Sequence, residues 1–227
     1  MRNFGLLLIK DGKGVSDLFL QLRDVSFKYR SSDSYVLRNF NLDVKKGEIV
    51  SIVGLSGSGK STVLRLIAGL EVPYNGSITI NKKLVVDDTT FVQPDRRNIG
   101  MVFQDYALFP HLTVAQNIAF GISKLSSKER SNRISELLSL INMKEYGERY
   151  PHQLSGGQQQ RVAVARALAP NPHLLLMDEP FSNIDCDLKE KMRQEIRSIL
   201  KAEAVTCIFV THDKTDVEDM ADRVIQL

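Results

Sequence analysis

The sequence predicts an α/β fold with a mostly parallel sheet, an N-terminal antiparallel β portion and an inserted helical subdomain. Two observations lead to this prediction: strand-length apolar runs alternate with helix-like segments, and a long helix-rich stretch interrupts them. The chain has 227 residues, which suffices for one domain of ordinary size. We expect the main domain to span residues 18–227, with the helical subdomain at about 105–168.

The first strands are predicted from hydrophobic period. Alternation indicates strands at Leu18–Tyr29 and Leu37–Val44, and alternating or β-branched pieces follow at Gly76–Ile80 and Lys83–Val86. The segment Ile49–Val53 is short and almost wholly apolar, and it ends at a glycine. Such a run is typical of a strand buried on both faces of a parallel sheet.

Helical and strand-like segments then alternate to the end of the chain. A helix is predicted at Ser61–Leu70, and the stretch from about Leu112 to Ala169 carries leucines at helical spacing. After it we expect a strand, a long amphipathic helix, a strand and a helix, at His173–Met177, near Leu188–Ala202, at Thr206–Thr211 and at Thr215–Met220. The last residue, Leu227, lies in a strand-like segment.

Composition excludes several classes of protein. With 25% charged and 43% hydrophobic residues, the chain is neither collagen-like, low in complexity nor wholly disordered. The net charge of +3 is too small to indicate nucleic-acid binding. Two cysteines, Cys186 and Cys207, form no disulfide framework and suit a reducing compartment.

The apolar N-terminal run does not predict a targeting or membrane segment. Phe4–Ile9 is shorter than the apolar core of a secretory signal, and charged residues follow it at once. No window approaches the roughly 20 apolar residues that a membrane helix needs. We therefore expect a soluble, cytoplasmic protein in which residues 1–17 form a mobile extension.

The first motif that indicates a chemical function is a glycine-rich loop between a predicted strand and a predicted helix. Gly54–Ser61 matches G-x-x-x-x-G-K-[ST], the P-loop pattern, in the context that confirms it. Its backbone N–H groups face one anionic centre, Lys60 reaches the phosphates and the Ser61 hydroxyl binds Mg²⁺. The alternative is a simple Gly/Ser-rich turn. The predicted ATP-binding residues at this loop are Gly54, Leu55, Ser56, Gly57, Ser58, Gly59, Lys60, Ser61 and Thr62.

Two carboxylates end the strand predicted at His173–Met177. A strand end beside a phosphate loop is where ligands bind in an open α/β sheet, so Asp178 is expected to hold Mg²⁺. Glu179 points differently and can orient or deprotonate the attacking water. The alternative is that both residues only begin a loop before Pro180. A kinase needs no second acid here, whereas hydrolysis needs a residue that manages water.

A second anion-binding helix start follows from the string Leu154–Gln158, LSGGQ. Ser155 is a good N-cap, and Gly156 and Gly157 leave backbone N–H groups uncovered. One P-loop already surrounds its triphosphate, so this second start is better explained as contacting ATP on another subunit. The alternative is an ordinary capped helix that binds no ligand.

With these motifs the chain resembles the ATP-binding cassette (ABC) ATPases over nearly all of residues 18–227. The resemblance implies that Gln104, in Val-Phe-Gln-Asp, senses Mg²⁺ and the attacking water, and that His212 contacts the γ-phosphate. It also implies that adenine stacks on Tyr29 and that Ser182–Asp185 crosses to a partner's site. Catalytic roles thus fall to Glu179, His212 and Gln104, Mg²⁺ binding to Ser61, Gln104 and Asp178, and binding across a head-to-tail dimer to Ser155, Gly156, Gly157, Gln158 and Asp185.

Some of these residues have ordinary alternatives. Taken alone, Gln104 would be a surface glutamine, and only its place in the motif supports a role. Tyr29 at a strand end would otherwise be a half-buried core residue. His212 follows an apolar strand, so its ring is expected to reach the crevice at the strand ends.

The segment after Gln104 is unusually apolar for a loop. Tyr106, Leu108, Phe109 and Leu112 surround Pro110, and we interpret them as a groove that receives a helix of a membrane subunit. The alternative is a small satellite core under the helical insertion. The strings FQDYALFPHLTV and FSNID look like importer cassettes, and the likeness is greatest to ferric-iron uptake cassettes. Sulfate, polyamine, molybdate and sugar cassettes remain alternatives, because the substrate does not touch this subunit.

The function hypothesis is an ATP-hydrolysing subunit that powers an ABC importer for ferric iron or another small ion or solute. ATP and Mg²⁺ are the expected ligands. The expected partners are a second copy of the chain, permease subunits and, indirectly, a solute-binding protein, with no nucleic acid, at the inner face of the cell membrane. Importer cassettes of this kind usually carry a further regulatory β-domain after the ATPase domain. The given sequence ends at Leu227, so regulation by such a domain cannot be read from it. A soluble ABC ATPase acting on nucleic acid or ribosomes is the alternative, and a P-loop kinase is a third.

Overall fold

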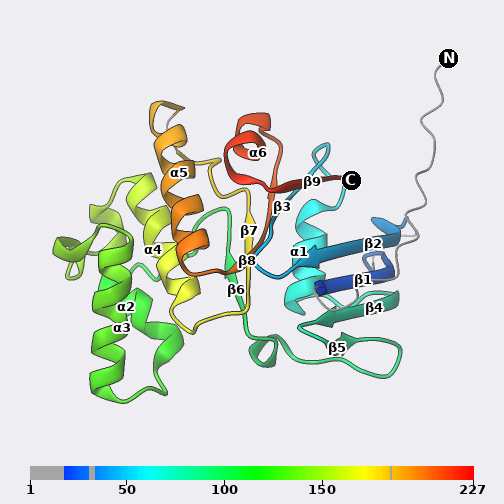
Figure 1. Cartoon of the computed structure of the whole chain (residues 1–227), viewed down its shortest axis with the longest axis horizontal. Coiled ribbons are helices and arrows are strands. Elements are labelled where there is room, and N and C mark those ends of the chain that lie inside the picture. Colours follow the sequence, from blue (N-terminus) through cyan, green and yellow to red (C-terminus); the bar gives the residue numbers. More distant parts are fainter. Residues whose placement is uncertain (1–17, 31–33, 185) are drawn as a thin grey trace.

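Two β-sheets enclose one helix, and the other helices lie beyond the second sheet. The computed structural model describes residues 18–30, 34–184 and 186–227, with side chains except those of Cys186 and Asp187. Helix α1 (Lys60–Ala68) lies between the two sheets, and α2 to α5 lie on the far side of the parallel sheet (Figure 1). The expected N-terminal extension, residues 1–17, lies outside the described residues.

The first sheet is antiparallel, as the sequence predicts. Its strand order is β2-β1-β4-β5, and each neighbouring pair is antiparallel. The alternating side chains of β1 bury Leu20 and Leu22 completely, which covers one face of the sheet. The strands are β1 (Leu18–Phe27), β2 (Leu37–Lys45), β4 (Asn75–Ile80) and β5 (Lys83–Val86).

The second sheet is parallel throughout and carries the strand ends that matter for function. Its order is β6-β7-β8-β3-β9, so the carboxyl ends of its strands meet at one edge. Strand β6 is absent from the sequence-based prediction because four residues with a central glycine show no clear period. The strands are β3 (Ile49–Val53), β6 (Ile99–Val102), β7 (Leu174–Asp178), β8 (Thr206–Thr211) and β9 (Arg223–Gln226).

Burial on both faces explains the apolar run of β7. Leu174 and Leu176 pack into the core shared with α1 and the antiparallel sheet, whereas Leu175 and Met177 pack into the core on the helical side. All four are fully buried. Burying a side chain of this size stabilises the fold by about 2 kcal/mol. The strand is therefore fixed between two cores, and its acidic end is held at a defined place.

The helix-rich stretch contains three helices, with boundaries set by local caps. The Thr113 side chain accepts a hydrogen bond from the Gln116 backbone, and Ser126 and Glu129 form the same capping box. The division of the chain at about 105–168 into a helical subdomain stays a prediction. The helices of this stretch are α2 (Val114–Ala119), α3 (Ser127–Leu140) and α4 (Gly156–Leu168), with 3-10 turns at Phe120–Ile122, Lys144–Tyr146 and Pro151–Gln153. A further 3-10 turn, Pro94–Arg96, lies before β6.

Two further helices, α5 and α6, lie in the last part of the chain, before the final strand β9. Helix α5 (Cys186–Ala202) packs against α6 (Lys214–Met220) and against α4. Helix α6 follows β8 after a single short turn. Among the helices that the structure describes, none is long and apolar enough to cross a bilayer.

Candidate active site

A cavity of about 600 Å³ lies at the carboxyl edge of the parallel sheet. It gathers segments that are far apart in the sequence: the P-loop, the strand ends after β6, β7 and β8, and the end of β1. Most of its lining was predicted from the sequence. The exception is Val36, an apolar residue with no motif around it. The lining residues are Tyr29, Val36, Ser56, Gly57, Gly59, Lys60, Ser61, Thr62, Gln104, Glu179 and His212.

The P-loop runs from β3 to α1 in a tight curve. Gly59 precedes the first helical residue with a φ of 101°, and a Cβ there would lie 2.9 Å from Val36 Cγ1. Only glycine adopts this conformation in this space without strain. The Lys60 ammonium donates hydrogen bonds to the carbonyl oxygens of Gly54 and Leu55, at 3.0 and 2.9 Å. The Lys60 side chain thus closes the P-loop by hydrogen bonds to the backbone of the loop itself.

Not every predicted P-loop residue lines the cavity. Gly54, Leu55 and Ser58 are absent from its lining, and the Leu55 side chain is exposed to solvent. The Ser58 hydroxyl is buried and has no hydrogen-bond partner among the described residues. A buried hydroxyl without a partner carries a free-energy cost, so this loop is ready to bind further polar groups.

The side chains of Ser61, in α1, and Asp178, at the end of β7, are in direct contact. The Ser61 hydroxyl donates to Asp178 Oδ1 at 2.8 Å, and Asp178 is almost fully buried. Two hard oxygen ligands beside the N-terminus of α1 suit Mg²⁺ bound to phosphates. Together with the Lys60 ammonium and the unpartnered Ser58 hydroxyl, these residues fit a magnesium nucleotide.

Glu179 leaves the strand in a left-handed conformation. Its φ is +48°, which costs a residue with a side chain about 1 kcal/mol or more. The Glu179 backbone N–H donates to the Val210 carbonyl at 3.0 Å, and Ser182 donates to the Glu179 carbonyl. These bonds hold the turn at Glu179, which lines the cavity, whereas Asp178 does not.

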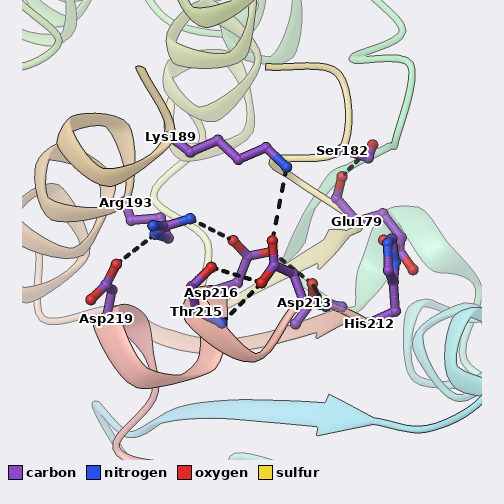
Figure 2. Close-up of polar contacts among 10 residues, drawn as sticks. Glu179, Ser182, Lys189, Arg193, His212, Asp213, Thr215, Asp216 and Asp219 are labelled. Atoms are coloured by element: carbon purple, nitrogen blue, oxygen red, sulfur yellow. Dashed lines mark hydrogen bonds and ion pairs between the residues drawn. The ribbon is translucent and has the colours of Figure 1, made fainter. Parts of the chain in front are cut away.

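His212 and Glu179 are direct neighbours. His212 Nδ1 lies 2.7 Å from Glu179 Oε2, so an imidazole with its proton on Nδ1 donates to the carboxylate. Figure 2 shows the two side chains facing each other from the ends of β8 and β7. The His212 side chain is 68% exposed and that of Glu179 is 17% exposed. The pair therefore combines a shielded carboxylate with an open imidazole at the cavity wall.

Gln104 follows β6 and lines the cavity. It is exposed, and its backbone carbonyl accepts a hydrogen bond from the Asn183 amide at 3.0 Å. Asn183 lies in the segment that follows Glu179, which links the loops after β6 and β7. The sequence offered no signal for this contact, because the two residues are 79 positions apart.

Tyr29 stands at the rim of the cavity. It is 37% exposed, its ring meets Phe27 edge-on at 4.9 Å, and its hydroxyl pairs with the Thr62 hydroxyl at 3.2 Å. One side of the ring is thus supported and part of it is open, which is the arrangement needed for stacking on a nucleotide base.

The glycine-rich start of α4 lies apart from this cavity. Ser155 caps the helix by accepting a hydrogen bond from the Gln158 backbone, and the Gln158 side chain bonds back to Ser155. Gly156 is half-buried and Gly157 is buried, and the anion-binding role of their backbone N–H groups stays a prediction. None of these residues lines the cavity of its own chain. Asp185, predicted beside them, lies outside the described residues.

The apolar loop after Gln104 is partly core. Tyr106 is 4% exposed, burial raises the pKa of its phenol, and it packs with Leu108 against the helical core. The prediction that Tyr106 forms part of a docking surface is wrong, because apolar contacts inside the helical portion bury it. Leu108 is only partly buried, and its docking role stays a prediction. Phe109 remains half-buried, and its ring lies 4.4 Å from that of the exposed Phe120. Phe109 and Phe120 therefore form an aromatic pair that is partly exposed to solvent.

Curated proteins of similar sequence are named as import ATP-binding proteins. The chain is 43% identical over 211 residues to a spermidine/putrescine protein of Oleidesulfovibrio alaskensis, covering 92% of this chain and 55% of the relative. It is 49% identical over 195 residues to a sulfate/thiosulfate protein of Synechocystis, covering 85% and 54%. It is 46% identical over 197 residues to an Fe(3+) ions protein of Fusobacterium nucleatum, covering 86% and 52%. The chain thus spans about half the length of these relatives.

A family model and solved structures point the same way. The model described as ABC transporter matches residues 37–182. The ATP-binding cassette MJ0796, a dimer bound to ADP and Pi, is 37% identical with a TM-score of 0.78, covering 92% of this chain and 94% of that one. The protein cbiO1 of Clostridium perfringens, part of the transporter complex cbiONQ, is 29% identical with a TM-score of 0.84, covering 92% and 84%.

Proposed function

The chain belongs to the ABC transporter ATPase family, and on that premise we propose that it hydrolyses Mg-ATP to power the import of a small solute. The observation that carries the proposal is the meeting of Lys60, Ser61, Glu179 and His212 at one cavity, with Asp178 bound to Ser61. These residues supply phosphate binding, metal binding and management of water within a single site.

The chemistry would be positioning and electrostatics. Lys60 and the N-terminus of α1 offset the charge of the phosphates, and Ser61 and Asp178 offer oxygen ligands to Mg²⁺. When bound, the metal neutralises charge on the β- and γ-phosphates. Water attacks the γ-phosphorus, the bond to the ADP oxygen breaks, and Glu179 accepts the proton of the water. His212 would hold Glu179 and contact the γ-phosphate, and its 2.7 Å contact with Glu179 supports the first of these roles.

A second copy of the chain would complete the site. Ser155, Gly156 and Gln158 begin a helix whose first N–H groups have no intrahelical partner, and they do not line the cavity of their own chain. Such a helix start favours an anion. In a head-to-tail dimer it would meet the γ-phosphate held by the other chain. The dimeric, ADP-bound state of MJ0796 supports this arrangement.

Solute import is the transport direction that the relatives support. Their names cover polyamines, sulfate and Fe(3+), at identities that differ by only a few percent. Ferric iron is therefore one of several candidate solutes. We infer that permease subunits dock at Phe109 and Phe120 and that a solute-binding protein delivers the solute to them, which would place this chain at the cytoplasmic face of the membrane.

The alternative of a soluble ATPase acting on nucleic acid or ribosomes gains no support. The relatives reported above are import proteins, and no observation on the described residues favours that alternative.

Two measurements test the proposal. The first is ATP hydrolysis by the purified chain with and without Mg²⁺, which we expect only with the metal. The second is a tagged pull-down from native membranes in mild detergent, with mass spectrometry of the captured proteins. A polytopic permease would support import and narrow the solute. Ribosomal or DNA-processing partners without any membrane protein would overturn the importer proposal.

A further inference from the structure

His212 has little direct support of its own. Its side chain is 68% exposed, and the contact with Glu179 is the one side-chain hydrogen bond reported for its ring within the described residues. The place of a side chain this open depends on the turn that carries it, because few other contacts from the described residues hold the ring. The residues on either side are both tied to neighbouring helices. Thr211 bonds to Asp216 of α6, and Asp213 contacts Thr215 of α6 and Lys189 of α5 (Figure 2).

The first tie is the Thr211 hydroxyl at the end of β8. Thr211 is 1% exposed, and its Oγ1 donates to Asp216 Oδ2 at 2.7 Å. The same oxygen accepts the backbone N–H of Asp213 at 3.1 Å. These two bonds span His212 from one side to the other, so they fix the turn that carries its side chain.

The second tie reaches from Asp216 to helix α5. Asp216 is 3% exposed, and its Oδ1 accepts a hydrogen bond from Arg193 at 3.1 Å. Arg193 also donates to Asp219 Oδ2 at 2.6 Å, so its planar fork joins two carboxylates of α6. Because Arg193 and Asp216 are buried together, losing Arg193 would leave the Asp216 carboxylate without its cation inside the protein.

The third tie acts on Asp213. Its carboxylate accepts two bonds from Thr215, which hold the pKa of Asp213 below its usual value, and it faces Lys189 at 3.9 Å. Lys189 and Arg193 are four residues apart, so both lie on one face of α5. Helix α5 begins directly after the segment 182–185.

We propose that Thr211, Asp216 and Arg193 are positioning residues that hold the His212 ring against Glu179 and couple it to helix α5. The proposal rests on the proposed function, because it assigns these residues a part in ATP hydrolysis by His212 and Glu179. Ser182, which precedes α5, donates to the Glu179 carbonyl. The contacts of Thr211 and Asp213 thus fix the turn of His212, and the Ser182 bond fixes the turn of Glu179. Because α5 is connected to both turns, a shift of α5 would move both side chains.

Two substitutions of Thr211 separate positioning from packing. Thr211→Val keeps the size of the side chain and removes the hydroxyl, whereas Thr211→Ser keeps the hydroxyl. Thr206→Val is a matched control at the other end of β8, where a hydroxyl of the same burial accepts the Gly47 N–H at 3.0 Å. A general loss of stability would affect both valine variants alike.

The direct measurement is nuclear magnetic resonance of the chain with ¹⁵N-labelled histidine. The chain has four histidines, and the His212 ring signals are assigned with His212→Gln. We expect Thr211→Val to shift and broaden the His212 signals and to leave the other three unchanged. Thr211→Ser and Thr206→Val should match the wild type. Unchanged His212 signals in Thr211→Val would overturn the proposal.

Turnover gives a second, independent readout. Thr211→Val should lower the kcat of ATP hydrolysis at least about tenfold with a nearly unchanged KM, since misplaced groups cost rate more than binding. Displaced His212 signals with wild-type kcat would overturn the catalytic part. If the wild type hydrolyses no ATP, the proposed function fails while the spectra still decide the positioning. Should Thr211→Val not fold, Arg193→Lys, which keeps the charge without the fork, is expected to show the same two effects.

Discussion

The Ser61 hydroxyl donates a hydrogen bond of 2.8 Å to Asp178 although 117 residues separate the two. Ser61 belongs to the first turn of α1 and Asp178 to the last position of β7, so the bond joins the phosphate loop to the acidic strand end. The hydroxyl and carboxylate oxygens already lie together in the protein.

Replacing Ser61 tests the metal site. Ser61→Ala removes one oxygen ligand and leaves Asp178 without its partner, so we expect the Mg²⁺ concentration for half-maximal ATP hydrolysis to rise at least about tenfold. A magnesium titration of ATPase activity measures this. Ser198→Ala is the control, because that exposed hydroxyl bonds the Gln194 carbonyl on α5. An unchanged magnesium requirement in Ser61→Ala would contradict the assignment.

Replacing Glu179 tests the general base. Glu179→Gln keeps the size of the side chain but cannot accept the proton of water, so we expect turnover to fall at least about a hundredfold. ATP binding should persist, because the phosphate loop is untouched. Single-turnover hydrolysis and equilibrium binding measure the two effects. The same substitution at the exposed Glu190 should leave both at wild-type values, and near-normal turnover in Glu179→Gln would reject the role.

Tyr29 tests base stacking. Tyr29→Ala removes the ring and should weaken ATP binding by about 1–3 kcal/mol, the usual contribution of one stacked base. Tyr29→Phe keeps the ring and loses only the bond to Thr62, so its affinity should stay close to the wild type. Calorimetry with ATP and with tripolyphosphate separates base from phosphate contacts. A loss of tripolyphosphate affinity in Tyr29→Ala would show that the tyrosine supports the loop and does not bind the base.

The exposed aromatic pair tests the docking of a membrane partner. Phe120→Asp places a charge beside Phe109, and we expect capture of the permease to fall at least about tenfold, the scale of a lost aromatic anchor. Val72→Asp is a matched control, since Phe120 and Val72 are both 59% exposed and Val72 follows α1 on the other side of the protein. Quantitative pull-down from membranes measures both, and equal capture by the two variants would argue for another docking surface.

The stability of the chain should decrease in acid through Asp222. Burial of Asp222 opposes its ionisation, but hydrogen bonds from Lys201, Ile49 and Arg197 outweigh this and lower its pKa below the ordinary 3.8. A lowered pKa in the folded state means that the stabilisation is present above pH 3.8 and is lost as the pH falls through the folded value.

Urea unfolding measures this effect. The midpoint of the wild type should exceed that of Asp222→Asn at pH 6, and the difference should shrink toward pH 3 as the carboxylate is protonated. A difference that is independent of pH would mean that Asp222 acts by packing and not by charge.

Much of the fold was predictable because local patterns and burial agree. Strand β8 was predicted with its observed ends, since six residues rich in β-branched side chains are too few for a typical helix and suit a strand buried on both faces. Strand β6 was not predicted, because Ile99–Val102 becomes a strand through its pairing with β7. The loop after Gln104 shows the same effect, since the environment of Tyr106 depends on helices that its own sequence does not reveal.

The sequence by itself predicted the chemistry: which residues are expected to bind phosphate, which acids follow β7, and that a second helix start carries a glycine pair. Those properties depend on residue type and spacing over a few positions, which are local. The tertiary structure alone decided that His212 faces Glu179 and that Asn183 holds the loop of Gln104. It also decided that Thr211 is tied to α5 through Asp216 and Arg193. These contacts join residues separated by tens of positions, and the physical reason is that only packing of the sheet and helices brings them within hydrogen-bonding distance.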